Sequence, residues 1–338
     1  MTLQRSLVGC TIALFTLAAC SEKQTEPAGA RVAEDSPVLD RSASLAAHAP
    51  HADAVTPASV VWETRGSALV AARALSPIAG MRAYGLLGMA DYAAVVSADG
   101  DHDLDDGADD ASHSNSPIKL ATQRGAVAGA SAQVLRYLFP LDVAQIESMV
   151  AADQAGAGTM GEQIHFTRGV TLGRAIGDII VKRGTSDGFT NPDGTPKVWD
   201  PSTLLAGPNI WAMDADATPH VPAGFQFPTM HAYYLASIDS KTPANAQFRP
   251  APPPADPTAG VKEVDSIVRV RTPAQAAISV FWNFTNGSIL PGGYWDTQAF
   301  SYIMQHQLGE ADAAHVLALV NSAGIDATIA CWDAKYHY

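Results

Sequence analysis

Three sets of residues in this sequence have types that could do chemistry: an aspartate-rich run, a scatter of histidines and one cysteine near the start. The aspartate-rich run spans residues 99–110, with aspartates at alternate positions from Asp99 to Asp105. This spacing resembles that of the oxygen ligands in a calcium loop. Counted from Asp101, however, an aspartate occupies the glycine position of an EF-hand and Ser112 occupies the position of the bidentate glutamate. A solvated acidic loop is therefore favoured, and no metal site is predicted.

The histidines do not form a ligand set. Those after residue 100 are scattered without metal-ligand spacing. His48 and His51 lie in a low-complexity stretch, where a solvated linker is favoured over a metal site. His231 precedes two tyrosines and could line a cleft, although a hydrogen-bonded structural histidine is favoured. The sequence also lacks the nucleophile-elbow, Walker, dinucleotide-binding and H-E-x-x-H motifs, so these residues alone indicate no function.

Cys20 ends a segment with the profile of a secretory signal. Arg5 supplies the positive charge, and residues 6–19 form an apolar run that is too short to span a bilayer. The sequence Leu17-Ala18-Ala19-Cys20 resembles the bacterial lipobox, in which the cysteine is acylated and becomes the new N-terminus. We therefore expect residues 1–20 to be a lipoprotein signal peptide and Cys20 to anchor an exported protein to a membrane of the cell envelope. The alternatives are a plain cleaved signal with an incidental cysteine and a cysteine that is half of a disulfide.

The segment after the cysteine is predicted to be a flexible tether. Ser21 directly follows Cys20, the pattern of outer-membrane retention if the source has two membranes. Residues 21–56 are rich in Ala, Ser, Glu and Pro and poor in aromatic residues. Such a segment buries too little apolar surface to offset the entropy lost on ordering.

The remaining residues, 57–338, are long enough for one large domain or two small ones, and we treat them as one helical domain. The chain has a net charge of -13 with only 16% charged residues, which makes nucleic acid an unsuitable partner. Outside the signal, Cys331 is the one remaining cysteine, so no intramolecular disulfide is expected. No stretch after residue 20 looks apolar for long enough to cross a membrane.

Helical patterning dominates this domain, and the predicted fold class is all-α. The helical spacing of apolar residues, together with the proline and glycine residues that end helices, predicts several helices. These cover residues 60–75, 79–98, 118–138, 141–156, 162–183, 273–289, 294–307 and 310 to the end. Residues 184–260 are instead rich in Pro, Gly and aromatic residues, which predicts a long irregular excursion that packs onto the helical scaffold. Ile267-Val268-Arg269-Val270 is the one short β candidate.

Several stretches of the chain resemble bacterial lipoproteins of the PAP2 (phosphatidic acid phosphatase type 2) superfamily that are related to vanadium-dependent haloperoxidases. The resemblance rests on their order and spacing over roughly residues 60–338. The matching stretches are Arg82-Ala83 with Met89-Ala90-Asp91-Tyr92-Ala93-Ala94, Arg183 with Asp187-Gly188, Gln247-Phe248-Arg249-Pro250 with Pro252-Pro253, Glu263-Val264, Arg271-Thr272-Pro273 with Gln275, Phe281-Trp282, Pro291-Gly292-Gly293-Tyr294-Trp295, and Cys331-Trp332-Asp333-Ala334-Lys335-Tyr336.

The resemblance implies a helical-bundle fold with an oxyanion pocket. In the family, three motifs build the pocket: K-x-x-x-x-x-x-R-P, P-S-G-H and a late S-R-x-x-x-x-x-H. Lysine and arginine donors surround the oxygens of vanadate or phosphate, and a histidine binds or attacks the central atom. With vanadate and peroxide, such an enzyme oxidises halide to hypohalous acid. Of these groups the sequence supplies Lys335, where the first motif begins.

The other pocket groups are missing from this sequence. There is no P-S-G-H, no arginine–proline pair after Lys335 and no candidate for the axial histidine, since His337 falls within the first motif's spacer. We therefore expect this chain to be the N-terminal portion of a vanadium-haloperoxidase-like protein, inactive as it stands and without bound vanadate or small-molecule substrate. Lys335 as a solvated lysine near a helix C-terminus is the alternative. Alternatives for the whole protein are an acid phosphatase of the same pocket type and a non-catalytic envelope lipoprotein.

Overall fold

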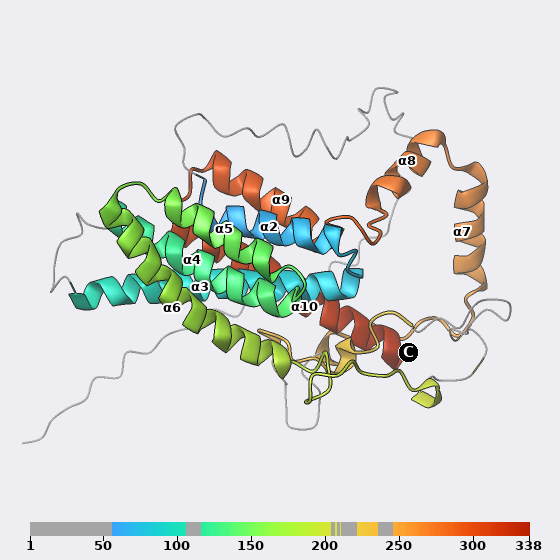
Figure 1. Cartoon of the computed structure of the whole chain (residues 1–338). Coiled ribbons are helices and arrows are strands. Elements are labelled where there is room, and N and C mark those ends of the chain that lie inside the picture. Colours follow the sequence, from blue (N-terminus) through green and yellow to red (C-terminus); the bar gives the residue numbers. More distant parts are fainter. Residues whose placement is uncertain (1–55, 106–115, 204–206, 208–209, 211–221, 236–245) are drawn as a thin grey trace, which may run out of the picture. The chain divides into compact units, whose positions relative to one another are not determined.

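The structure is a computed structural model that describes residues 56–105, 116–203, 207, 210, 222–235 and 246–338. The predicted signal peptide, Cys20 and nearly all of the tether lie outside these residues. The described part contains α-helices and short 3-10 turns but no β-strand, so the all-α class is confirmed (Figure 1). The helices are α2 (Ala58–Ala72), α3 (Pro77–Asp105), α4 (Pro117–Leu138), α5 (Val143–Ala155), α6 (Met160–Thr185), α7 (Thr258–Val270), α8 (Pro273–Trp282), α9 (Leu290–Gln305) and α10 (Glu310–His337).

Helix α3 is the centre of the helical bundle, since α2, α4, α6, α9 and α10 all pack against it. Its side chains Tyr84 and Leu87 are almost fully buried, together with Trp62 of α2 and Leu135 of α4. A second apolar cluster joins α9 to α10 and includes Ile303. Burial of such apolar side chains is the main term that stabilises a helical bundle. The described residues contain no disulfide that could add to it.

Helices α4 and α6 meet through small residues. A Cβ atom at Gly169 or Gly173 of α6 would fall well inside van der Waals distance of the carbonyl oxygens of Thr122 and Ala126 on α4. The two helix backbones therefore lie in direct contact along this line. Local signals also agree with the boundaries: Thr159 and Glu162 form a capping box at the start of α6.

The aspartate-rich run is not wholly a loop, and the prediction was wrong for its first half. Helix α3 continues to Asp105, and residues 106–115 lie outside the described part. The reason is a tertiary contact that the local sequence does not show. The Asp99 carboxylate accepts a hydrogen bond from Gln123 Nε2 at 2.6 Å and lies 3.4 Å from Lys119 Nζ, so α4 offsets part of the negative charge.

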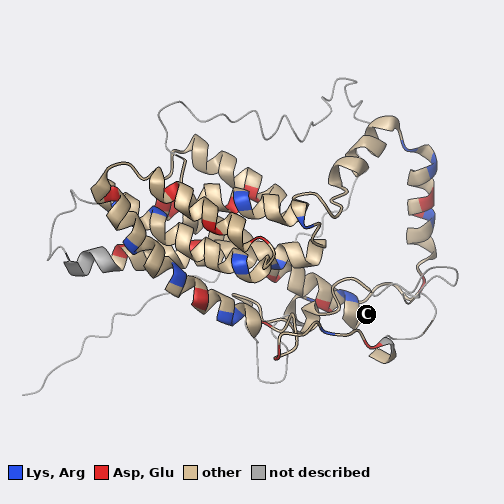
Figure 2. Ribbon diagram, in the orientation of Figure 1, with Lys and Arg blue, Asp and Glu red and all other residues tan. Residues whose placement is uncertain are grey.

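The predicted β candidate at Ile267–Val270 is also wrong, because these residues lie in helix α7. A lone extended segment has no partner for its backbone hydrogen bonds, whereas Val261, Val264 and Val268 recur at helical spacing on one face. Basic and acidic residues alternate with them along α7 (Figure 2). Neither α7 nor α8 has a buried residue, and their apolar side chains are largely exposed.

Helix α10 corrects one further expectation. Among the described helices, it alone is long and apolar enough to cross a membrane by length and composition. It packs into the bundle, however, where Leu317, Ile325 and Ile329 are buried. Core helices of water-soluble proteins meet the same criteria, so this is weak evidence for a membrane span.

Candidate functional site

Lys335, the one pocket residue that the resemblance supplies, lies in the last turn of α10 and is exposed. Its ammonium nitrogen lies 3.8 Å from the centre of the Trp332 ring, a cation–π contact. No ion pair involves it within the described residues. The lysine is thus a positive charge that an anion can reach, at the helix end that the backbone dipole makes favourable for a cation.

Trp332 is held in place by the irregular segment before α7. Its indole N–H donates to the carbonyl oxygen of Ala223 at 2.7 Å, and its ring lies 6.0 Å from that of the buried Phe227. Gly224 has a φ of +77°, and a Cβ there would collide with the indole ring. The chain can approach the tryptophan this closely only with glycine at this position.

Two aspartates of α10 attach the same segment to the helix. The Asp326 carboxylate accepts backbone hydrogen bonds from Tyr233 and Tyr234, each at 2.7 Å. Asp333 forms a bidentate ion pair with Arg249, with Arg249 Nε 2.5 Å from Asp333 Oδ2. Asp333, the acidic residue nearest to Lys335 in the sequence of the helix, is therefore already paired with an arginine.

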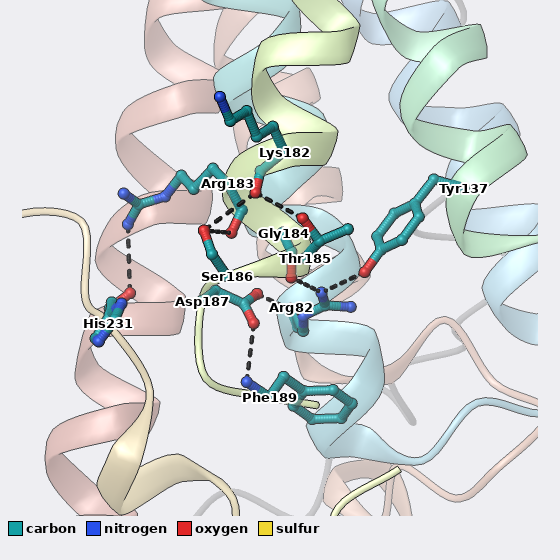
Figure 3. Close-up of polar contacts among 10 residues, drawn as sticks. All are labelled: Arg82, Tyr137, Lys182, Arg183, Gly184, Thr185, Ser186, Asp187, Phe189 and His231. Carbon is teal, nitrogen blue, oxygen red and sulfur yellow. Dashed lines mark hydrogen bonds and ion pairs between the residues drawn. The ribbon is translucent and has the colours of Figure 1, made fainter. Parts of the chain in front are cut away.

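A buried network at the start of α3 fixes the chain that leaves α6. Arg82 Nε donates to Asp187 Oδ2 at 2.6 Å, while Arg82 Nη2 donates to the Gly184 carbonyl at 2.6 Å and to the Tyr137 hydroxyl at 3.0 Å (Figure 3). Asp187 in turn accepts from the backbone N–H of Phe189 at 2.9 Å. Since the donors and acceptors of this network are paired with one another, it positions the backbone rather than offering groups to a ligand.

His231, proposed from sequence as a possible cleft residue, is exposed and is held through its backbone. Its N–H donates to the Asp187 carbonyl oxygen at 2.8 Å, and its own carbonyl accepts from Arg183 Nη2 at 3.3 Å (Figure 3). The Arg183 guanidinium also stacks 4.0 Å from the centre of the Tyr233 ring. These contacts give His231 and Arg183 structural roles.

The structure brings several of the sequence-selected residues to one end of the bundle. Stretches around Arg82, Asp187, Arg249 and Trp332 meet there around a small apolar cluster. The cluster comprises Ile78, Met81, Phe227, Met230, Ile325 and Ile329. In the part of the chain that the structure describes, no three His, Cys, Asp or Glu side chains are arranged to hold a metal ion. Lys335 is exposed at this end, and so is Lys182 in the last turn of α6. Of the two, only Lys335 lies at a position that the resemblance assigns to a pocket.

A second group of ionisable residues, in the interior, was not predicted from sequence. Glu63 of α2, Asp91 of α3 and Asp296 of α9 are each fully buried. Asn321 of α10 donates to Glu63 Oε1 at 3.1 Å, and the Ser131 hydroxyl donates to Asp91. Among the described residues, neither Asp296 oxygen has a partner in hydrogen-bond geometry, nor do Glu63 Oε2 and Asp91 Oδ2. The one feature of the sequence that could have indicated this group is a single acidic residue within an otherwise apolar helical stretch, as at Asp91.

Burial sets the protonation of this carboxyl cluster (Glu63, Asp91 and Asp296). Loss of solvation raises the pKa of Asp296 to about 8, with a partial offset from the nearby Asn321 amide. Desolvation likewise raises the pKa of Glu63 well above its ordinary value, and the negative charges of Asp296 and Asp91 raise it further. The pKa of Asp91 is raised for the same first cause, against the opposing hydrogen bond from Ser131. An uncharged form is therefore favoured at neutral pH.

The surroundings of Glu310, at the start of α10, differ from those of the carboxyl cluster. Its carboxylate oxygens accept from the backbone N–H groups of Ala58 at 2.5 Å and Ser59 at 2.8 Å. The residue before α2, Pro57, provides no side-chain cap. Glu310 therefore caps a helix that begins some 250 residues earlier in the chain.

Comparison with family models, curated proteins and solved structures finds no match to this chain.

Proposed function

We propose that this chain is the helical scaffold of an exported oxyanion-pocket protein of the vanadium haloperoxidase and PAP2 type, with Lys335 as the first group of the pocket. The observation that carries the proposal is the position of Lys335. Its charge is exposed at the end of α10, held over Trp332, and without an ion-pair partner among the described residues. An ammonium group placed in this way can donate hydrogen bonds to the oxygens of a tetrahedral anion.

The surroundings of Lys335 support the same proposal. Stretches selected from the sequence because they resemble this family meet around the last turns of α10, where ion pairs fix them. Their contribution is indirect: they hold the tryptophan and the helix end in place. Precise support of this kind is what an anion site needs, since its donors must be fixed before the anion arrives.

The remaining pocket groups would, by the same resemblance, belong to polypeptide that this sequence does not contain. The exposed apolar faces of α7 and α8 support this, because they include Val264, Ile278 and Trp282 at more than half exposure each. Large exposed apolar surfaces usually mark a packing interface. We propose that these faces pack against the segment that carries the other pocket groups.

The test compares this chain with its longer reading frame. The gene is read past codon 338 for the R-P and P-S-G-H motifs, and both forms are assayed for bromination of an indicator with vanadate and peroxide. We expect turnover from the longer form alone, and its loss in the Lys335→Met variant. Vanadate-dependent turnover by residues 21–338 alone would contradict the proposal.

Two other outcomes identify the alternatives. If the longer form hydrolyses a phosphomonoester but does not oxidise bromide, the pocket is that of a phosphatase. If the reading frame ends at Tyr338 and the protein accumulates folded, the chain is a non-catalytic envelope lipoprotein. In that case, α7 and α8 are its binding surface.

A further inference from the structure

The carboxyl cluster lacks the counter-charge that buried acids normally have. Glu63, Asp91 and Asp296 come from three different helices and are each 0% exposed. Within the described residues, no lysine or arginine forms an ion pair with any of them. An ionised carboxylate in a dry interior without a partner is very unfavourable, and it takes up a proton instead.

A bound metal ion is the other way to neutralise such a cluster, and the geometry does not favour it. The described part of the chain contains no group of three or more His, Cys, Asp or Glu side chains arranged around a common point. Protonation removes the buried charge without a metal ion. It also fits carboxyl oxygens that have no donor beside them among the described residues, since a protonated carboxyl carries its own hydrogen.

We propose that Glu63, Asp91 and Asp296 form a proton-storing cluster that docks α9 onto α2 and α3, and that α9 loosens as rising pH removes the protons. Asp296 is the contribution of α9. Ionisation would place several like charges next to one another in a medium that screens them poorly. The polar and charged groups that surround the cluster on the neighbouring helices are Tyr84 on α3, Arg124 and Ser131 on α4, and Glu310 and Asn321 on α10.

The direction of the pH effect follows from these surroundings. In the folded protein, burial raises the pKa of Asp296 to about 8, whereas the ordinary value is 3.8. Between these two values, the folded state keeps a proton that the unfolded chain has lost. Stability is therefore highest at the acid end of this interval and decreases as the pH rises through it. The positive charge of Arg124 lowers the pKa of Glu310. It does not reverse the decrease in stability with rising pH.

The experiment measures the thermal unfolding midpoint of the full chain between about pH 5 and about pH 9, with amide hydrogen exchange of α9. We expect the wild-type midpoint to fall with pH and the α9 amides to exchange faster before the rest of the bundle does. Asp296→Asn, which has nearly the same shape but no proton to lose, should flatten the profile. The matched control is Asp312→Asn, an exposed carboxylate on α10, which should follow the wild type.

Three results would overturn the proposal. The first is a wild-type midpoint that does not change with pH, and the second is an Asp296→Asn profile as steep as the wild type. The third is a rise of the wild-type midpoint with calcium or magnesium that Asp296→Asn abolishes, because the cluster would then be an ionised cation site. If the variant does not fold, infrared spectroscopy of the wild type decides: absence of a protonated-carboxyl band at neutral pH contradicts proton storage.

Discussion

Arg82 and Asp187 form a buried ion pair, with Arg82 Nε 2.6 Å from Asp187 Oδ2 and both side chains less than a tenth exposed. The pair connects the first turns of α3 to the loop after α6, and the Arg82 guanidinium also lies 4.8 Å from the centre of the Phe189 ring. In sequence these residues are members of separate stretches that resemble one family. In the structure they form one support for the end of the bundle that carries Lys335.

Removing the arginine should destabilise the fold strongly. Arg82→Met leaves the Asp187 carboxylate buried without its partner, and we expect the free energy of unfolding to fall by about 3–5 kcal/mol. Urea denaturation measures the change. The control is Arg269→Met on α7, which breaks an exposed ion pair with Asp265 and should cost about 0.5 kcal/mol or less. The double variant Arg82→Met with Asp187→Leu should regain part of the loss. If it is no more stable than the single variant, the unpaired charge is not the cause.

The contact between α4 and α6 gives a second prediction. A methyl group at Gly173 would meet the Ala126 carbonyl, so Gly173→Ala must force the two helices apart. We expect a loss of about 1–3 kcal/mol in the free energy of unfolding. Gly161→Ala is the same substitution on the same helix at an exposed position with room for a methyl, and it should stabilise by about 0.5–1 kcal/mol. Equal effects of the two substitutions would show that helix propensity, not packing, decides the outcome.

Glu310 provides a third prediction, because α2 has no local cap. Glu310→Ala leaves the part-buried N–H of Ala58 and the buried N–H of Ser59 without their acceptor, and we expect a loss of about 1–3 kcal/mol in the free energy of unfolding. Glu310→Gln keeps one acceptor oxygen and should lose less. Hydrogen exchange should show fraying at the start of α2 in the alanine variant. An equally protected α2 in both variants would contradict the capping contact.

The sequence predicted the helices whose local signals and tertiary contacts agree. Helix α6 is the clearest case, since a capping threonine precedes its apolar pattern. Two of the failed predictions, the acidic loop and the β candidate, have a tertiary cause. Asp99 continues a helix because side chains of α4 offset its charge. Ile267–Val270, with three β-branched residues, is helical, and the described part of the chain contains no strand that could pair with it. β-branched residues favour strands only where a sheet exists to receive them.

The two candidate sites also differ in how far the sequence alone could reveal them. Lys335 could be selected from the sequence because the motif around it is continuous and resembles a family. The carboxyl cluster could not, because Glu63, Asp91 and Asp296 are far apart in the chain and meet only when three helices pack. A lone acidic residue in an apolar helix lies more often at the surface than in the interior. Only the packing of α9 against α2 and α3 distinguishes the two.

The last prediction separates the structural from the chemical role at the end of α10. Trp332→Ala removes the contact with Phe227 and the hydrogen bond to Ala223, and it should lower the free energy of unfolding by about 2 kcal/mol or more. Lys335→Met keeps the length of the side chain and loses only an exposed cation–π contact, so we expect a change below about 1 kcal/mol. Urea denaturation of both variants provides the comparison. If Lys335→Met is as destabilising as Trp332→Ala, the lysine is a structural residue and its proposed place in an oxyanion pocket loses its support. If it is nearly neutral, its exposed charge is free to serve a ligand.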